Sequence, residues 1–330
     1  MDHSHPGGRL PARPGHRGAV VSDVPAPVAL LCPGQGAQRP GFTRAWMQHP
    51  VFARRMAELS SATGLDLSHH GTDSDAGTLR DTAVAQPLIV AAGLAAAALL
   101  PRSPADLVLA GHSVGEVTAA ALAGVLSQGA AVTFVAERGR AMAAAAGLND
   151  TGMSAVLGGD LDEVLTAVSR HGLVAANING AGQVVAAGPL GGLAALAADP
   201  PAAARVRSLQ VAGAFHTPHM APAERALAGP AAALSPADPW VPLLSNADGT
   251  VLSDGAEVLR RLVSQVSRQV RWDLCMTTLE RLGVRTVVEL PPAGALSGLV
   301  KRALPGVRVI SLRGPDDLDS LSGLFGPAPV

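Results

Sequence analysis

The sequence predicts an α/β protein with an α/β-hydrolase-like large domain and an inserted ferredoxin-like small subdomain. Short apolar segments lead into glycine turns that are followed by helical stretches, which is the signature of an α/β core. A βαββαβ pattern occupies residues 152–211, between two stretches of the α/β type. The chain has 330 residues, 48% of them hydrophobic and 15% charged, so it can bury a large core.

The large domain is expected to comprise residues 27–151 and 212–320. Its first expected elements are a strand at 28–32, helices at 51–64 and 84–100, a chain break at 101–104, a strand at 107–110 and a helix at 114–123. Core-like segments, TVVELP and VRVISL, follow the βαββαβ unit. We therefore interpret that unit as an insertion and expect the active-site cleft where the two parts meet.

The subdomain and the chain ends complete the predicted organisation. The six elements of the subdomain are expected as a strand at 152–159, a helix at 160–172, strands at 173–178 and 183–188, a helix at 190–199 and a strand at 206–213. Residues 1–26 are rich in Gly, Pro, Arg and His, which predicts a disordered N-terminal extension. Residues 321–330 are expected to form a C-terminal tail.

Charge and composition exclude several classes of protein. With 25 basic and 26 acidic residues, the chain has no net field that would recruit nucleic acid or an anionic membrane. No apolar run approaches the ~18 residues of a membrane helix, and the start of the chain lacks the apolar stretch of a signal peptide. Cys32 and Cys275 have no spacing typical of a zinc site or a disulfide framework. We expect a cytoplasmic protein without a metal.

The segment GHSVG, residues 111–115, matches the pattern of a nucleophile elbow between a strand and a helix. Ser113 would project into the cleft, and the amide of Val114 at the helix N-terminus would face a developing oxyanion. In a chain with 37 glycines, the alternative is a purely structural turn.

A serine hydroxyl needs a base to remove its proton, so one of the ten histidines should provide it. Most of them fall in the N-terminal extension, in surface loops or at helix ends, and His112 should face away from the neighbouring serine. His216 and His219 remain, in the apolar segment VAGAFHTPHM at the domain junction. For His216 the alternative is a hydrogen-bonded core histidine.

Arg138 lies on the apolar face of a helix expected at 127–146. That face is formed by Ala131, Phe134, Val135, Ala141, Met142 and Ala145. A guanidinium that points to the core needs a polar partner, from either the protein or a ligand. The partner could be a buried carboxylate such as Glu116 or Asp162, or a free carboxylate on an acyl substrate.

Seven ordered motifs resemble those of malonyl-CoA:acyl carrier protein transacylases of the stand-alone bacterial type, over roughly residues 27–320. They are GQGAQ (34–38), TAVAQP (82–87), GHSVGE (111–116), ERGRAM (137–142), ANINGAGQVVAAG (176–188), GAFHTPHM (213–220) and QVSRQVRW (265–272). One departure is ELPPAGAL at 289–296, where many relatives carry a Gly-Pro-Gly turn.

The resemblance implies a role for individual residues. Ser113 would be acylated and His216 would act as its general base, oriented by the backbone carbonyl of Gln265. Gln35 would join the Val114 amide in the oxyanion hole, and Arg138 would bind the malonyl carboxylate. Further acyl-pocket or histidine-side positions would be Met142, Asn177 and Phe215.

The expected activity is transfer of a malonyl group from malonyl-CoA to the phosphopantetheine thiol of an acyl carrier protein, in fatty-acid or polyketide biosynthesis. Malonyl-CoA is then a substrate, no cofactor is expected, and the enzyme is expected to be a monomer. One alternative is a serine hydrolase or thioesterase, although no acidic residue is obviously placed to complete its triad. Another is a catalytically silent module that only binds carrier protein.

Overall fold

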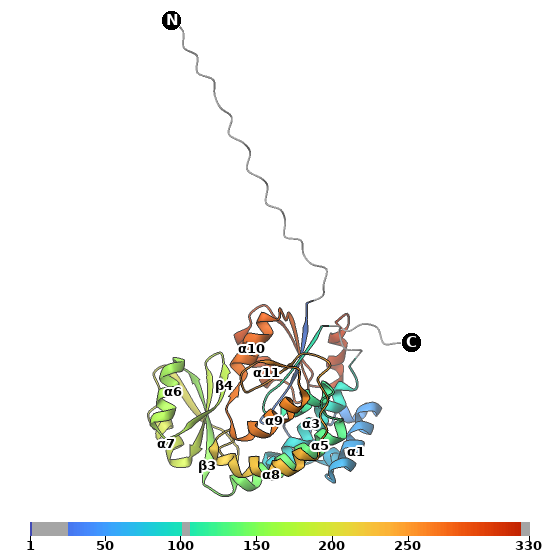
Figure 1. Cartoon of the computed structure of the whole chain (residues 1–330), viewed down its shortest axis with the longest axis horizontal. Coiled ribbons are helices and arrows are strands. Elements are labelled where there is room, and N and C mark those ends of the chain that lie inside the picture. Colours follow the sequence, from blue (N-terminus) through green and yellow to red (C-terminus); the bar gives the residue numbers. More distant parts are fainter. Residues whose placement is uncertain (2–25, 101–105, 325–330) are drawn as a thin grey trace.

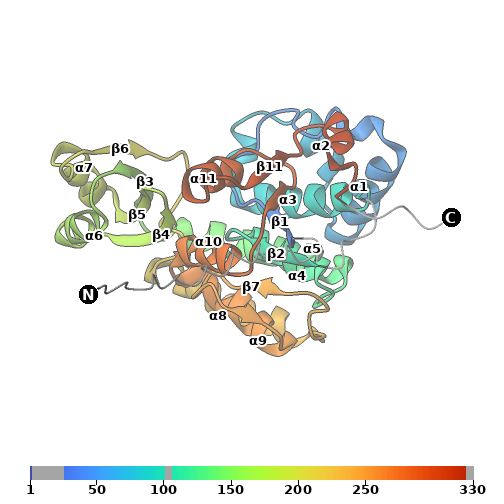
Figure 2. The same ribbon diagram turned by 90° about the horizontal axis from the view of Figure 1, so that it is seen from above.

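The computed structural model describes residue 1 and residues 26–100 and 106–324. These residues form two lobes, each built around its own β-sheet. Figures 1 and 2 show the lobe with β3 to β6 beside a larger lobe that contains the N-terminal and C-terminal segments of the described chain. The prediction of a large α/β domain with an inserted smaller unit is confirmed.

The large sheet has the strand order β11-β10-β1-β2-β7-β8, in which only the edge pair β7–β8 is antiparallel. Its strands are β1 (Val28–Cys32), β2 (Leu107–Gly111), β7 (Leu243–Leu244), β8 (Val251–Leu252), β10 (Thr286–Glu289) and β11 (Arg308–Ser311). The first strand has the bounds that the apolar run predicts. All five of its residues are buried, as in parallel strands covered on both faces.

Helices cover both faces of the large sheet. They are α1 (Pro50–Thr63), α2 (Leu67–Thr72), α3 (Thr82–Ala97), α4 (Gly115–Leu122), α5 (Gln128–Ala146), α8 (Ala221–Ala232), α9 (Gly255–Ser264), α10 (Trp272–Arg281) and α11 (Ala295–Ala303). Side chains alternate along β1: Val28 and Leu30 join the hydrophobic cluster of α1, α3 and α5, whereas Ala29 and Leu31 join that of α10 and α11. The two clusters fix the sheet between two helical layers.

The smaller lobe has the topology of a ferredoxin-like fold. Its elements are β3 (Thr151–Gly158), α6 (Leu161–Arg170), β4 (Val174–Gly180), β5 (Gln183–Pro189), α7 (Leu190–Ala198) and β6 (Ala204–Ser208). The sheet order is β6-β3-β5-β4, and these strands pair antiparallel. Valines, leucines and alanines of α6 and α7 pack on one face of this sheet. The predicted βαββαβ order is therefore confirmed.

A short strand from the larger lobe extends the small sheet. β9 (Val270–Arg271) pairs parallel with β4, opposite Asn177 and Ile178. The segment that precedes β9 contains the 3-10 turn Gln265–Ser267, which contributes to the site described below. The two lobes are thus joined by backbone hydrogen bonds as well as by the chain connections.

Some predicted boundaries differ from those observed. The last subdomain strand ends at Ser208 rather than at 213, because pairing with β3 ends there and Gly213 instead lies directly against Ala146 of α5. At the C-terminus, Leu321 is buried in the main core and Leu324 packs against it, so the ordered chain continues past residue 320. The predicted N-terminal extension, the chain break at 101–104 and the end of the predicted tail lie mainly outside the described residues.

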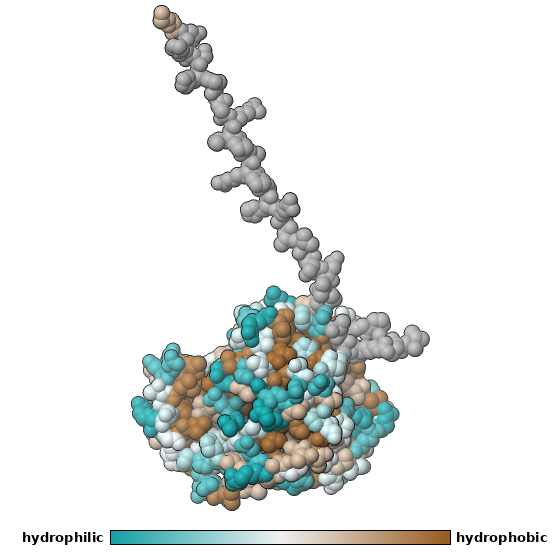
Figure 3. Space-filling model, viewed as in Figure 1, coloured by the Kyte–Doolittle hydropathy of each residue, from teal (hydrophilic) through white to brown (hydrophobic). Residues whose placement is uncertain are grey.

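On the face shown in Figure 3, hydrophilic and hydrophobic residues are interspersed. Three of the exposed large hydrophobic residues of the described chain, Leu161, Val174 and Leu190, lie in the smaller lobe. None of the helices in the described ranges is long and apolar enough to cross a membrane.

Replacement of Gly115 tests how closely the turn after β2 packs on β1. A Cβ at this position would lie 2.1 Å from the carbonyl oxygen of Cys32, so we expect Gly115→Ala to destabilise the fold by about 1–3 kcal/mol or more. Gly129→Ala is the matched control, because the added methyl would meet no atom within 4 Å and should stabilise α5 slightly. Chemical denaturation of both variants measures the difference; equal stabilities would contradict this packing.

Candidate active site

Ser113 lies in a tight turn between β2 and α4. Its φ of 53° is in the left-handed region, which is strained for a residue other than glycine. The turn is possible because Gly111 and Gly115 approach each other so closely that a Cβ on Gly111 would lie 2.1 Å from the Gly115 carbonyl group. The strained conformation and the strand-turn-helix setting are those of a nucleophile elbow.

The hydroxyl of Ser113 is in direct contact with His216. Its Oγ lies 2.7 Å from Nε2 of His216, and Nδ1 of the same ring lies 2.9 Å from the backbone carbonyl oxygen of Gln265. A carbonyl oxygen can only accept a hydrogen bond, so Nδ1 carries the proton and Nε2 is free to accept the one from Ser113. His216 is therefore in the tautomer that a general base requires.

Two forces hold the His216 imidazole neutral. Burial, together with the nearby positive charge of Arg138, lowers its pKa to about 3. His216 is 4% exposed, and its backbone has a positive φ of 60°. The backbone N–H of His216 donates to the carbonyl of Val266 at 3.0 Å, which anchors the histidine to the Gln265–Ser267 turn.

Arg138 is 1% exposed, as its place on the apolar stripe of α5 predicts. Its guanidinium donates to two side-chain amides: Nη1 to Oε1 of Gln86 at 2.6 Å and Nη2 to Oε1 of Gln265 at 2.8 Å. Neither of the carboxylates considered as a direct partner, Glu116 or Asp162, hydrogen-bonds to it within the described chain. The guanidinium is oriented without being neutralised by a contacting carboxylate.

Three of the remaining predicted positions, Val114, Met142 and Phe215, lie next to residues of this centre. Val114 is buried, and the described hydrogen bonds leave its backbone N–H without an acceptor, as an oxyanion donor would require. Met142 is buried one turn after Arg138 on α5, and its sulfur accepts from Gln86 at 3.4 Å. Phe215 is buried directly before the histidine.

Asn177 and Gln35 make no hydrogen bond to Ser113, His216 or Arg138 in the described chain. Asn177 is 6% exposed, and its Oδ1 has no hydrogen-bond partner in the described chain. The loop of Gln35 lies against the elbow, because a Cβ on Gly34 would be 2.7 Å from the carbonyl oxygen of His112. The Gln35 side chain itself donates to the carbonyl of Arg80 at 3.4 Å, so its oxyanion role stays a prediction.

His112 is engaged away from the serine, as predicted. Its Nε2 donates to Oδ1 of Asn179 at 2.9 Å, and its ring packs edge-on against Trp272. The other candidate base, His219, is half-buried in the turn Pro218–Met220, and the pairing with Ser113 is made by His216.

Asn246 is a part of the site that the sequence did not reveal. This residue is 0% exposed, and its Oδ1 accepts from the backbone N–H of Ser113 at 2.7 Å while its Nδ2 donates to the carbonyl of Gly111 at 2.7 Å. The amide thus bridges both arms of the elbow and leaves Val114 as the free amide beside the serine. An asparagine in the loop segment SNADG carries no signal of such a contact. The position of Gln86 in the TAVAQP motif likewise does not indicate its contact with Arg138.

Comparison with known proteins agrees with this geometry. The chain matches the acyl transferase domain family over residues 29–311. The chain therefore contains an acyl transferase domain, and the Ser113–His216 pair lies within it.

The relatives are more specific. A malonyl CoA-acyl carrier protein transacylase of Mycobacterium tuberculosis is 51% identical over 301 residues, which cover 90% of this chain and 100% of that protein. The crystal structure of MCAT from Mycobacterium tuberculosis has a TM-score of 0.84 and 49% identity, and the match covers 90% of this chain and 99% of that one. A structure of PlMCAT with AntF, a type II PKS acyl-carrier protein, has a TM-score of 0.82 and 27% identity, and the match covers 89% and 98% of the two chains. The chain belongs to the malonyl CoA-acyl carrier protein transacylase family.

The lowered pKa of His216 predicts an unusual pH dependence. An imidazole with the ordinary pKa of 6.5 would be about 90% protonated at pH 5.5 and would lose about tenfold in rate as a base. We expect acylation of Ser113 at pH 5.5 to stay within about twofold of its rate at pH 7.5, measured by rapid quench and mass spectrometry.

The stability of the fold must be measured at the same pH values, because the lowered pKa of His216 also makes the free energy of unfolding depend on pH. Below pH 6.5 His216 of the unfolded chain binds a proton, whereas the folded state excludes this proton until the pH approaches 3. The free energy of unfolding therefore decreases as the pH is lowered from about 6.5 to about 3. Circular dichroism at each pH confirms that the enzyme is still folded. A tenfold loss of rate with a midpoint near pH 6.5, in folded protein, would contradict a neutral, buried base.

Proposed function

We propose that the protein transfers the malonyl group of malonyl-CoA to the phosphopantetheine thiol of an acyl carrier protein, through a malonyl ester on Ser113. The observation that carries this proposal is the position of Arg138. This buried guanidinium lies next to the Ser113–His216 pair through Gln265, and it has amide partners but no contacting carboxylate in the described chain. A substrate that brings its own carboxylate fits such a site.

The reaction needs two successive attacks on a carbonyl carbon. In the first, His216 takes the proton of Ser113 as Oγ bonds to the thioester carbon, and the C–S bond then breaks with the proton passing to the coenzyme A sulfur. In the second, the carrier thiol gives its proton to His216 as its sulfur bonds to the ester carbon, and the C–Oγ bond then breaks with the proton passing from His216 to Oγ of Ser113. We propose that the amide of Val114, together with Gln35, binds the oxyanion in both steps.

Gln265 provides the third member of the catalytic group by its backbone. In a hydrolase triad, a carboxylate accepts the Nδ1 proton of the histidine and stabilises the imidazolium. Here the acceptor is a neutral carbonyl, and Arg138 adds a positive charge nearby, so the imidazolium is short-lived. This arrangement favours rapid return of the proton to a leaving thiol.

In this proposal both lobes contribute residues to the site. The serine, histidine and arginine come from the large domain, which we place at residues 27–151 and 212–320, and Asn177 comes from the subdomain at 152–211. Met142, Asn177 and Phe215 would line the acyl pocket. Because all these groups come from one chain, we propose a monomer that acts in the cytoplasm on substrates alone, without a cofactor, and with the carrier as its protein partner.

Radiolabelled malonyl-CoA tests the proposed function directly. With a holo carrier protein, the label is expected on the carrier thiol and, when the carrier is omitted, on Ser113. Ser113→Ala removes the bond-forming atom and should abolish both signals. Free malonate with an unlabelled carrier would instead identify a hydrolase, and absence of acylated Ser113 by mass spectrometry would identify a silent binding module.

Replacement of Arg138 tests substrate selection. Loss of a charge-assisted contact to the malonyl carboxylate costs about 1.5–3 kcal/mol, so Arg138→Ala should lower kcat/KM for malonyl-CoA about 10- to 100-fold and change acetyl-CoA far less. Arg140→Ala is the control, because that arginine is exposed and pairs with Glu137. An unchanged preference for malonyl over acetyl in Arg138→Ala would remove Arg138 from this role.

A further inference from the structure

Two opposite charges are buried close to each other in the site without touching. Glu116, on the first turn of α4, is 6% exposed, and Arg138 is 1% exposed. Burial raises the pKa of Glu116 to about 8 even though the Asn246 N–H and the charge of Arg138 favour the carboxylate form. Both carboxyl oxygens face N–H donors, of Asn246 and Gln265, which is the arrangement of the ionised group. Burial lowers the pKa of Arg138 to about 10, and the charge of Glu116 opposes that change. Each charge stabilises the other from a distance.

The side-chain amide of Gln265 lies between them. Its Oε1 accepts from Nη2 of Arg138 at 2.8 Å, and its Nε2 donates to Oε2 of Glu116 in a short contact and to the carbonyl of Ser113 at 3.2 Å. An amide can be turned by 180° with little change of shape, so something must determine which end faces the arginine. The guanidinium only donates hydrogen bonds and the carboxylate only accepts them, so the two together select the orientation with the amide oxygen toward Arg138.

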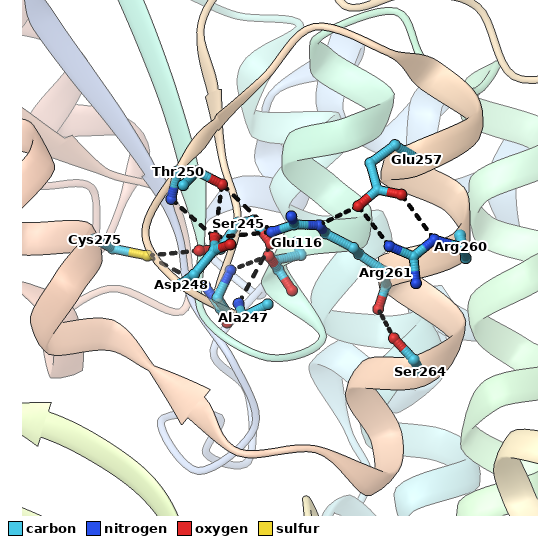
Figure 4. Close-up of polar contacts among 11 residues, drawn as sticks. Glu116, Ser245, Ala247, Asp248, Thr250, Glu257, Arg260, Arg261, Ser264 and Cys275 are labelled. Atoms are coloured by element: carbon cyan, nitrogen blue, oxygen red, sulfur yellow. Dashed lines mark hydrogen bonds and ion pairs between the residues drawn. The ribbon is translucent and has the colours of Figure 1, made fainter.

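In the described chain Glu116 makes no direct hydrogen bond to a cation, although the charge of Arg261 also favours its carboxylate form. Its Oε1 accepts from the backbone N–H of Asn246 at 2.6 Å, which leaves Oε2 for Gln265. The nearby Arg261 lies between Asp248 and Glu257 and pairs with both, at 2.8 and 2.6 Å (Figure 4). Arg261 is therefore satisfied by its own carboxylates, and the negative charge of Glu116 is directed at the Gln265 amide.

We propose that Glu116 is a positioning residue for malonyl recognition, which fixes the Gln265 amide so that its oxygen aims the guanidinium of Arg138 at the substrate carboxylate. The inference rests on the proposed function. The amide also acts as a spacer: a carboxylate in direct contact with Arg138 would take the hydrogen bonds that the malonyl group needs. With the spacer, the arginine keeps a counter-charge nearby and still has donors for a ligand.

Glu116→Gln tests the positioning role with little change in volume. Both carboxylate oxygens accept from N–H donors, whereas glutamine offers one oxygen and one NH₂ group, so one contact becomes donor against donor in either orientation. We expect kcat/KM for malonyl-CoA to fall about tenfold or more, mainly through KM, while acylation of Ser113 by acetyl-CoA stays within about threefold. The preference for malonyl over acetyl narrows accordingly.

The exchange variant Glu116→Gln/Gln265→Glu tests the spacer. It keeps one carboxylate and one amide, but places the carboxylate against Arg138, where it competes with the substrate. We expect the ratio of malonyl to acetyl transfer to fall by about tenfold or more. A wild-type preference in either variant would overturn the proposal, as would a parallel fall of malonyl and acetyl transfer, which would indicate a merely structural role.

A matched control is available in Glu289, at the end of β10. This carboxylate is 0% exposed and accepts from three backbone N–H groups, of Gly294, Leu296 and Ser297. Glu289→Gln reports the general effect of removing a buried carboxylate, and the malonyl preference should remain that of the wild type. Thermal unfolding of all variants shows whether they are folded.

A second route keeps the test decisive if Glu116→Gln does not fold. Gln265→Met removes the amide link but keeps the backbone carbonyl that orients His216, and we expect the same narrowing of preference; an unchanged preference would overturn the proposal. Failure of the proposed function is recognised separately, because wild-type enzyme would then form no malonyl ester on Ser113. A wild-type ester together with an unchanged preference in the variants refutes only the role of Glu116.

Discussion

The hydrogen bonds of Gln265 connect Ser113, His216, Arg138 and Glu116. Its backbone carbonyl holds the Nδ1 proton of His216, its side-chain oxygen accepts from Arg138, and its side-chain nitrogen donates toward Ser113 and Glu116. The nucleophile, the base and the arginine come from three different segments of the chain. Their relative positions therefore depend on one short 3-10 turn, Gln265–Ser267, that packs between them.

That turn is itself held from both lobes. The segment after it forms β9, which adds to the small sheet beside β4, and the segment before it is α9 of the larger lobe. A relative movement of the lobes would therefore change the environment of Gln265 and of Asn177, which faces Val270 in the register. The inserted subdomain is in this way coupled to the chemistry by its backbone pairing, although it supplies neither the nucleophile nor the base.

Burial allows a neutral imidazole, of His216, and a charged guanidinium, of Arg138, to lie close together. A neutral imidazole can lie near a guanidinium because desolvation and the positive charge both oppose its protonation. The guanidinium in turn is stabilised by two amide oxygens and by a carboxylate beyond one of them. In the proposed function a substrate carboxylate would complete this group of charges, so Arg138 would select the substrate and would also add to the desolvation that keeps the base neutral.

The sequence by itself determined the local features, because these depend on neighbours along the chain. Glycines around Ser113 allow the strained turn, the apolar run at 28–32 forms the central strand, and the apolar stripe of α5 places Arg138 inside the protein. The tertiary structure alone decided the contacts between distant segments: Asn246 on the elbow lies 133 positions from Ser113, and Glu116 reaches Arg138 through Gln265. Such contacts leave no periodicity or motif, because a single buried amide is equally compatible with many loops until packing fixes its partners. The stop of β6 at Ser208 was likewise set by pairing with β3 and not by the apolar residues that follow it.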